Sequence, residues 1–146
     1  MARKKEQLLY DRFKDHATGR LLFHRIENLM MNGMPDMIVQ NKKGVTAWVE
    51  NKAIEAWPAR ASTVPLRTAF QPGQLSFLRE WRNWGGDSYV FLRVGKGTNA
   101  EYMLLSPQLP IDVMTQEQLR QRAVVKSGAM PEMVKFFENM GGESAA

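Results

Sequence analysis

Residues 33–52 read GMPDMIVQNKKGVTAWVENK and predict a β-hairpin that brings two carboxylates and one ammonium group to the same place. The polar residues 40–44 end in glycine and predict the turn, with an apolar strand on each side of it. Because side chains alternate along a strand, Glu50 and Lys52 share one face. Burying either costs several kcal/mol unless it is paired or binds a metal. We therefore expect Asp36, Glu50 and Lys52 to serve chemistry rather than packing.

The spacing of these three residues resembles the PD-(D/E)xK motif of the restriction-endonuclease-like nuclease superfamily, with Pro35 completing its first part. Gly33 before the motif, and the segment Gln71-Pro72-Gly73-Gln74 after it, resemble the VRR-NUC and phage Holliday junction resolvase branch. The resemblance extends over about residues 20–105. It implies an Mg²⁺-dependent endonuclease, with Mn²⁺ able to substitute, that cuts DNA to leave a 5′-phosphate and a 3′-hydroxyl. It also implies a homodimer selective for four-way junctions or other branched DNA.

The resemblance assigns roles to individual residues. Asp36 and Glu50 supply oxygen ligands, which suit Mg²⁺, and Glu27 is preferred to Glu6 as a third carboxylate, with the choice left open. Lys52 orients or deprotonates the attacking water or neutralises developing charge. Gln74, in the first turn of the following helix, is expected to hydrogen-bond the lysine, the water or the phosphate, with Gln71 as the competing choice. The structural alternative is an isolated aspartate beside a Glu50–Lys52 ion pair.

Composition agrees with a nucleic-acid partner. The chain of 146 residues predicts one domain and carries a net charge of +5 with a pI near 9.7. A basic surface attracts phosphate backbones, although it also serves solubility alone. The candidate DNA contacts are Lys4, Lys5, Arg25, Arg60 and Arg67. There is no cysteine, which excludes disulfides and thiolate zinc sites. With no long apolar run and no apolar leader, we expect no membrane contact and a cytoplasmic location, in the host cell if a phage encodes the chain.

The remaining pattern predicts an α/β fold with a mixed sheet, ordered helix, three strands, helix, two strands. The expected helices are 4–16, one from about 74 to 84, 116–122 and 131–139, and the strands outside the hairpin are 20–27, 88–94 and 101–105. Strand 88–94 is apolar on both faces, which indicates a buried central strand parallel to the one before it. Residues 54–70 predict an irregular loop that passes the site. We expect a nuclease core over 1–106 and a helical C-terminal extension over 107–146, packed on the core or on a partner chain, with a frayed tail.

Two other functions fit the same chain. The first is a non-catalytic DNA-binding accessory protein of recombination, which intact Asp36, Glu50 and Lys52 oppose. The second is a restriction or repair nuclease with sequence preference, which the lack of a separate recognition module disfavours.

Overall fold

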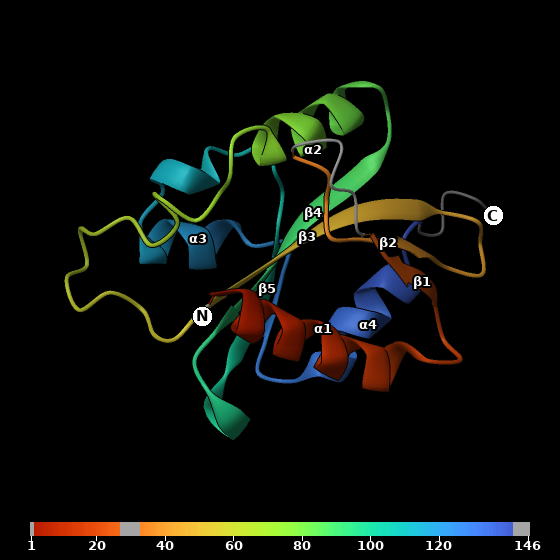
Figure 1. Ribbon diagram of the computed structural model, residues 1–146, viewed down its shortest axis with the longest axis horizontal. Coiled ribbons are helices and arrows are strands. Elements are labelled where there is room, and N and C mark those ends of the chain that lie inside the picture. Colours follow the sequence, from red (N-terminus) through yellow and green to blue (C-terminus); the bar gives the residue numbers. More distant parts are fainter. Residues whose placement is uncertain (1, 27–32, 142–146) are drawn as a thin grey trace.

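The computed structural model describes residues 2–26 and 33–141, with side chains from residue 5 onward. Within these residues a single mixed sheet carries helices on both faces, which confirms the predicted α/β fold (Figure 1). The helices are α1 (Ala2–Ala17), α2 (Gln74–Asn83), α3 (Gln116–Arg122) and α4 (Met130–Glu138). The strands are β1 (Leu22–Arg25), β2 (Met37–Gln40), β3 (Thr46–Ile54), β4 (Asp87–Val94), β5 (Glu101–Leu105) and β6 (Val125–Ser127), and 3₁₀ turns occupy Gly97–Asn99 and Ile111–Val113.

The strands lie side by side in chain order, from β1 to β6. Every neighbouring pair is antiparallel except β3 and β4, which are parallel because α2 crosses over between them. The β2–β3 hairpin pairs Met37 with Val49 and Gln40 with Thr46. The predicted hairpin, the parallel pair and the order helix, three strands, helix, two strands are thus confirmed.

The two faces of the sheet bury separate apolar clusters. Helices α1 and α4 lie together on one face, and α2 lies on the other (Figure 1). The first cluster includes Phe13, Phe91 and Phe137, and the second includes Leu78 of α2 and Leu119 of α3. Along β3 the faces alternate as expected, because Val49 belongs to the first cluster and Trp48 to the second. Glu50 and Lys52 therefore face the α2 side.

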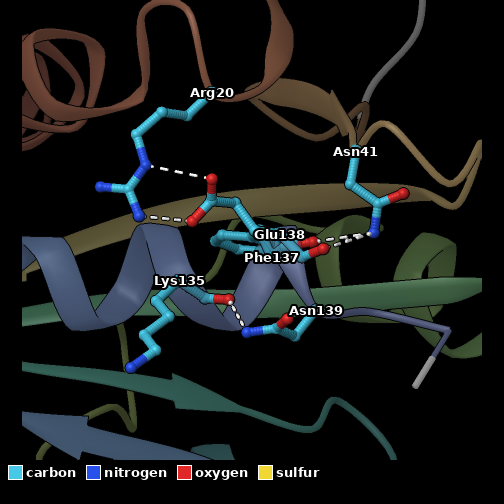
Figure 2. A network of polar contacts seen from close by, with 6 residues as sticks. All are labelled: Arg20, Asn41, Lys135, Phe137, Glu138 and Asn139. Atoms are coloured by element: carbon cyan, nitrogen blue, oxygen red, sulfur yellow. Dashed lines mark hydrogen bonds and ion pairs between the residues drawn. The ribbon is translucent and has the colours of Figure 1, made fainter. Parts of the chain in front are cut away.

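Polar contacts connect helix α4 to the β2–β3 hairpin turn and to the turn after α1 (Figure 2). The amide nitrogen of Asn41, in the hairpin turn, donates to the backbone carbonyls of Phe137 at 3.0 Å and Met140 at 2.9 Å. Arg20, just after α1, forms an ion pair with Glu138. Buried polar groups keep their hydrogen bonds in stable proteins, so Asn41 fixes the hairpin against the end of α4.

The start of β1 and the presence of β6 differ from the sequence analysis. β1 begins at Leu22 rather than at residue 20, because Arg20 and Leu21 donate backbone hydrogen bonds to Ala17 in the turn that ends α1. The short strand β6 was not predicted. Residues 55–73 contain neither helix nor strand, as predicted for the long loop. None of the described helices combines the length and the apolar character needed to cross a bilayer.

Candidate active site

The site lies where β3 extends past the start of β2 and keeps only β4 as a neighbouring strand. β3 is nine residues long and β2 only four. The β2 ladder stops at Met37 opposite Val49, whereas β4 pairs with β3 as far as Ile54. Asp36 lies immediately before β2, and its Oδ2 accepts the backbone N–H of Asn51 on this unpaired edge of β3 at 2.8 Å. A carboxylate thus stands where another strand would otherwise continue the ladder.

Glu50 is buried beside this carboxylate. It is 1% exposed, and its Oε2 accepts a hydrogen bond from Gln74 Nε2 at 2.9 Å and lies 3.3 Å from Lys52 Nζ. Its other oxygen, Oε1, has no hydrogen-bond partner among the described residues. Burial, followed by repulsion from Asp36, raises the pKa of Glu50 to about 8, against the lowering effect of Lys52. Lys52 therefore offsets only part of the cost of burying Glu50 beside Asp36.

Lys52 and Gln74 form the other half of the cluster. Lys52 is 5% exposed and donates to Gln74 Oε1 at 3.0 Å, and its Nζ lies 5.2 Å from the centre of the Phe70 ring. Gln74 Oε1 also accepts the backbone N–H of Gln71 at 2.9 Å. The amide of Gln74 therefore bonds Lys52 through its oxygen and Glu50 through its nitrogen. Of the two glutamines considered from the sequence, Gln74 is the one whose side chain joins the cluster.

A close contact between two glycines brings the two halves together. Gly33 has a φ of +85°, and a Cβ built on it would lie 2.6 Å from the backbone of Gly73. No side chain fits in that space. Gly73 directly precedes α2 and Gln74, and Gly33 directly precedes the Met34–Asp36 segment. The glycine of the sequence motif is thus explained by the approach of the Asp36 segment to the start of α2.

These side chains line one cavity of about 590 Å³. Its lining includes Asp36, Glu50, Lys52 and Gln74, with Pro65, Thr68 and Ala69 contributed by the long loop. Glu6 of α1 lines the same cavity, and burial raises its pKa, partly offset by Lys52. Glu27, preferred to Glu6 in the sequence analysis, lies outside the described residues. The structure therefore places Glu6 at the site and leaves Glu27 unplaced.

The residues present fit a divalent cation held by few protein ligands. Within the described part of the chain, no three histidine, cysteine or acidic side chains gather closely enough to hold a metal together. Asp36 and Glu50 nevertheless interact directly, and one buried oxygen of Glu50 has no hydrogen-bond partner in the part of the chain that the structure describes. Mg²⁺ keeps several waters and takes one or two carboxylates. The pair and its unsatisfied oxygen suit such an ion.

The candidate DNA contacts that the structure describes do not line the cavity of about 590 Å³ that holds the cluster. Arg25 lies over the Tyr10 ring at 5.4 Å and shares a small cavity with Glu6 and Asp36. Arg60 and Arg67 are exposed in the long loop. Lys5 pairs with Glu55 at 3.0 Å, and the side chain of Lys4 lies outside the described structure.

Trp57, Phe70 and Arg93 also lie near the candidate site or the loop that lines it. Trp57 packs against the core and donates to Glu101 at 2.8 Å, so it anchors the long loop. The position of Phe70 over Lys52 was not foreseen. Arg93 was also missed, although a single charged residue in the apolar strand 88–94 was a visible signal.

No protein-family model and no curated protein sequence matches the chain. Among solved structures, the Holliday junction resolvase Hjc of Archaeoglobus fulgidus is similar with 16% identity and a TM-score of 0.47, covering 72% of this chain and 74% of that one. A structure described as a VRR_NUC domain is similar with 22% identity and a TM-score of 0.45, covering 63% of this chain and 85% of that one. Both carry names that the sequence resemblance also gives. Likeness this distant carries no argument about activity, which has to come from the side chains.

Proposed function

We propose that the chain is a nuclease that hydrolyses phosphodiester bonds in DNA at the cavity between α1, β3 and α2. The observation that carries the proposal is the buried cluster at the open end of β3. Glu50 and Lys52 are buried there beside the half-buried Asp36, and one carboxylate oxygen of Glu50 has no hydrogen-bond partner among the described residues. Such an arrangement is costly unless a cation and a substrate complete it.

Asp36 and Glu50 are the residues that would hold Mg²⁺, with Mn²⁺ as a substitute. Bound there, the ion would supply positive charge to a phosphate oxygen and activate water, as metals do in phosphoryl transfer. The backbone N–H of Asn51 fixes Asp36 in orientation. Gln74 Nε2 donates to Glu50 Oε2 and holds it in place, so that Glu50 Oε1 remains available to bind the ion. The protein thus sets both carboxylates before any ligand arrives, which lowers the cost of binding one.

Lys52 acts on the water and the phosphate. An ammonium group has three donors, and two of them are directed at Gln74 Oε1 and Glu50 Oε2. The third orients the attacking water or stabilises charge that develops on the phosphate. The Phe70 ring beside Nζ shields this group from solvent. Gln74 is a positioning residue, because it holds Lys52 and Glu50 in one relative arrangement.

Branched DNA is the proposed substrate, with a four-way junction as the leading case and a 5′-phosphate as the product end. This part of the proposal rests on the sequence resemblance, together with the basic charge of the chain. The resemblance also supports a homodimer, in which each subunit cuts one strand. Sedimentation of the protein with and without a junction tests the dimer directly.

The test uses purified protein with end-labelled four-way junction, flap and duplex, in Mg²⁺, Mn²⁺ or EDTA. We expect cleavage only with a divalent ion and strongest on the junction. Glu50→Gln should abolish cleavage and keep DNA binding, while Glu132→Gln, an exposed acid on α4, should cut like the wild type. Equal cutting of plain duplex would remove the preference for branches and keep the nuclease. Binding without cutting would favour the accessory protein, and full activity in Glu50→Gln would refute this site.

A further inference from the structure

A second cavity, of about 420 Å³, lies beside the candidate active site. Ala53 and Ile54 line both cavities. Of two consecutive residues of α1, Lys5 lines this cavity and Glu6 lines the candidate active site. We call it the Arg93 pocket, after the arginine of β4 that lines it. It uses none of the residues to which the proposed chemistry is assigned.

Arg93 is the unusual group in this pocket. It is only 7% exposed, and its Nε is buried without a hydrogen-bond partner among the described residues. No described acidic side chain forms an ion pair with it. An isolated buried charge costs far more than a paired one. A guanidinium kept in this state is suited to an anion from outside the chain.

The rest of the lining favours an anion as well. The ionisable side chains are Lys5, Arg12, Arg93 and Lys96 with a single carboxylate, Glu55, so the described lining carries a formal charge of +3. Glu55 is half exposed and already lies 3.0 Å from Lys5 and 3.8 Å from Lys96. It pairs with both lysines at the rim, offsets one of their two charges and leaves Arg93 without an ion pair among the described residues. Guanidinium groups bind phosphate oxygens through two parallel hydrogen bonds.

We infer that the Arg93 pocket binds a phosphate group of the DNA strand close to the one that is cut. The shared lining supports this placement. Arg93 lies on the α1 side of the sheet and Lys52 on the α2 side, and the two cavities meet at Ala53 and Ile54, at the end of β3. A strand bound in both cavities would be held at two points, which fixes the scissile phosphate in the active site. The identity of the ligand as DNA rests on the proposed function, whereas the anion site rests on the pocket alone.

The test measures binding of a short single-stranded oligonucleotide by fluorescence anisotropy in EDTA, where no cleavage occurs. Arg93→Met should weaken binding about tenfold and lower the slope of log K against log salt by about 0.7, the value for one phosphate contact. The same variant should melt no lower than the wild type, because an unpaired buried charge is removed. Arg12→Gln and Lys96→Gln, at exposed positions of the pocket, should weaken binding in the same direction. Lys43→Gln, in the hairpin turn at the other end of β3, is the matched control and should leave both quantities unchanged.

Oligonucleotides with a 5′-phosphate or a 5′-hydroxyl identify the source of the phosphate. A loss confined to the phosphorylated oligonucleotide assigns the pocket to a terminal phosphate, and an equal loss with both assigns it to an internal one. Unchanged binding in Arg93→Met, or a loss no larger than in Lys43→Gln, would overturn the inference. Failure of the nuclease looks different, because a protein that never cuts but binds through Arg93 loses only the proposed function.

Discussion

Both halves of β3 are largely buried, but the first half buries apolar side chains and the second half buries polar and charged ones. The first half, 46–49, lies between β2 and β4, and Trp48 and Val49 enter the apolar clusters on opposite faces. The second half, 50–54, has β4 on one side and buries Glu50, Asn51 and Lys52. The change occurs just after Val49, which pairs with Met37, the first residue of β2. An interrupted sheet edge thus gives buried polar groups an opening to a cavity.

This contrast separates stability from chemistry along one strand. Apolar burial in the first half supplies free energy of folding. The second half carries desolvated charges, which oppose folding unless they are paired. Substitutions in the first half should therefore reduce stability at little cost in activity, and those in the second half should do the reverse.

The strongest test is Lys52→Met, in the polar half. We expect the cleavage rate to fall by about 10³-fold, the range seen when a group that stabilises a transition state is removed. The free energy of unfolding should change little. Glu50 loses its ammonium partner but can take up a proton, because its pKa is already raised, and an apolar side chain of similar length replaces Lys52. Single-turnover cleavage and urea unfolding of the same preparations measure the two effects. A large loss of stability with normal cleavage would reverse the assignment of the two halves.

The polar half should also make stability depend on pH. The pKa of Glu50 is about 8 in the folded state, against an ordinary value of 4.5, so between these pH values the folded state holds more protons than the unfolded state. Raising the pH should then lower the free energy of unfolding of the metal-free protein, by roughly 3–5 kcal/mol in total. Urea unfolding in EDTA at several pH values measures this slope.

Glu50→Gln is the control for this slope, since it removes the titrating group and should flatten the dependence. Saturating Mg²⁺ should restore stability most at high pH, because a metal binds the deprotonated carboxylates. Wild-type stability that rises from about pH 5 to 8 would contradict the raised pKa of Glu50.

Much of this arrangement follows from local pattern. The hairpin, α2 and the parallel β3–β4 pair are set by alternation, by helical spacing and by the glycines at turns, all of which act over a few residues. The convergence of Asp36, Glu50 and Lys52 follows from the hairpin register. The capping box at Thr115 and Gln118 fixed the start of α3 in the same local way.

Other features depend on contacts between distant segments, which no local pattern encodes. Glu6 reaches the cavity because α1 packs beside the end of β3, forty-odd positions later in the chain. β6 is three residues long, and its ladder with β5 is what defines it. Asn41 reads as a turn residue in the sequence, and only the fold shows it bonded to the end of α4.

A smaller effect is expected in the apolar half. Val49→Ala removes two methyl groups from a fully buried position and should lower the free energy of unfolding by about 2 kcal/mol. Cleavage per folded molecule should stay within about twofold of the wild type, since Val49 faces the cluster under α1 and not the cavity. Thermal melts and cleavage below the melting temperature check both statements. If activity falls as steeply as in Lys52→Met, the division of β3 is wrong.

The smallest effect concerns Gln74, which supports the polar half from α2. Gln74→Ala should slow cleavage about tenfold, because Lys52 and Glu50 lose the amide that sets their spacing while keeping each other at 3.3 Å. Gln74→Glu should be slower still, since it replaces the donor to Glu50 with a like charge. Gln71→Ala is the matched control, because Gln71 contributes a backbone N–H and its side chain is exposed. Cleavage rates measured at saturating DNA would rank these three, and a loss in Gln71→Ala alone would transfer the role to Gln71.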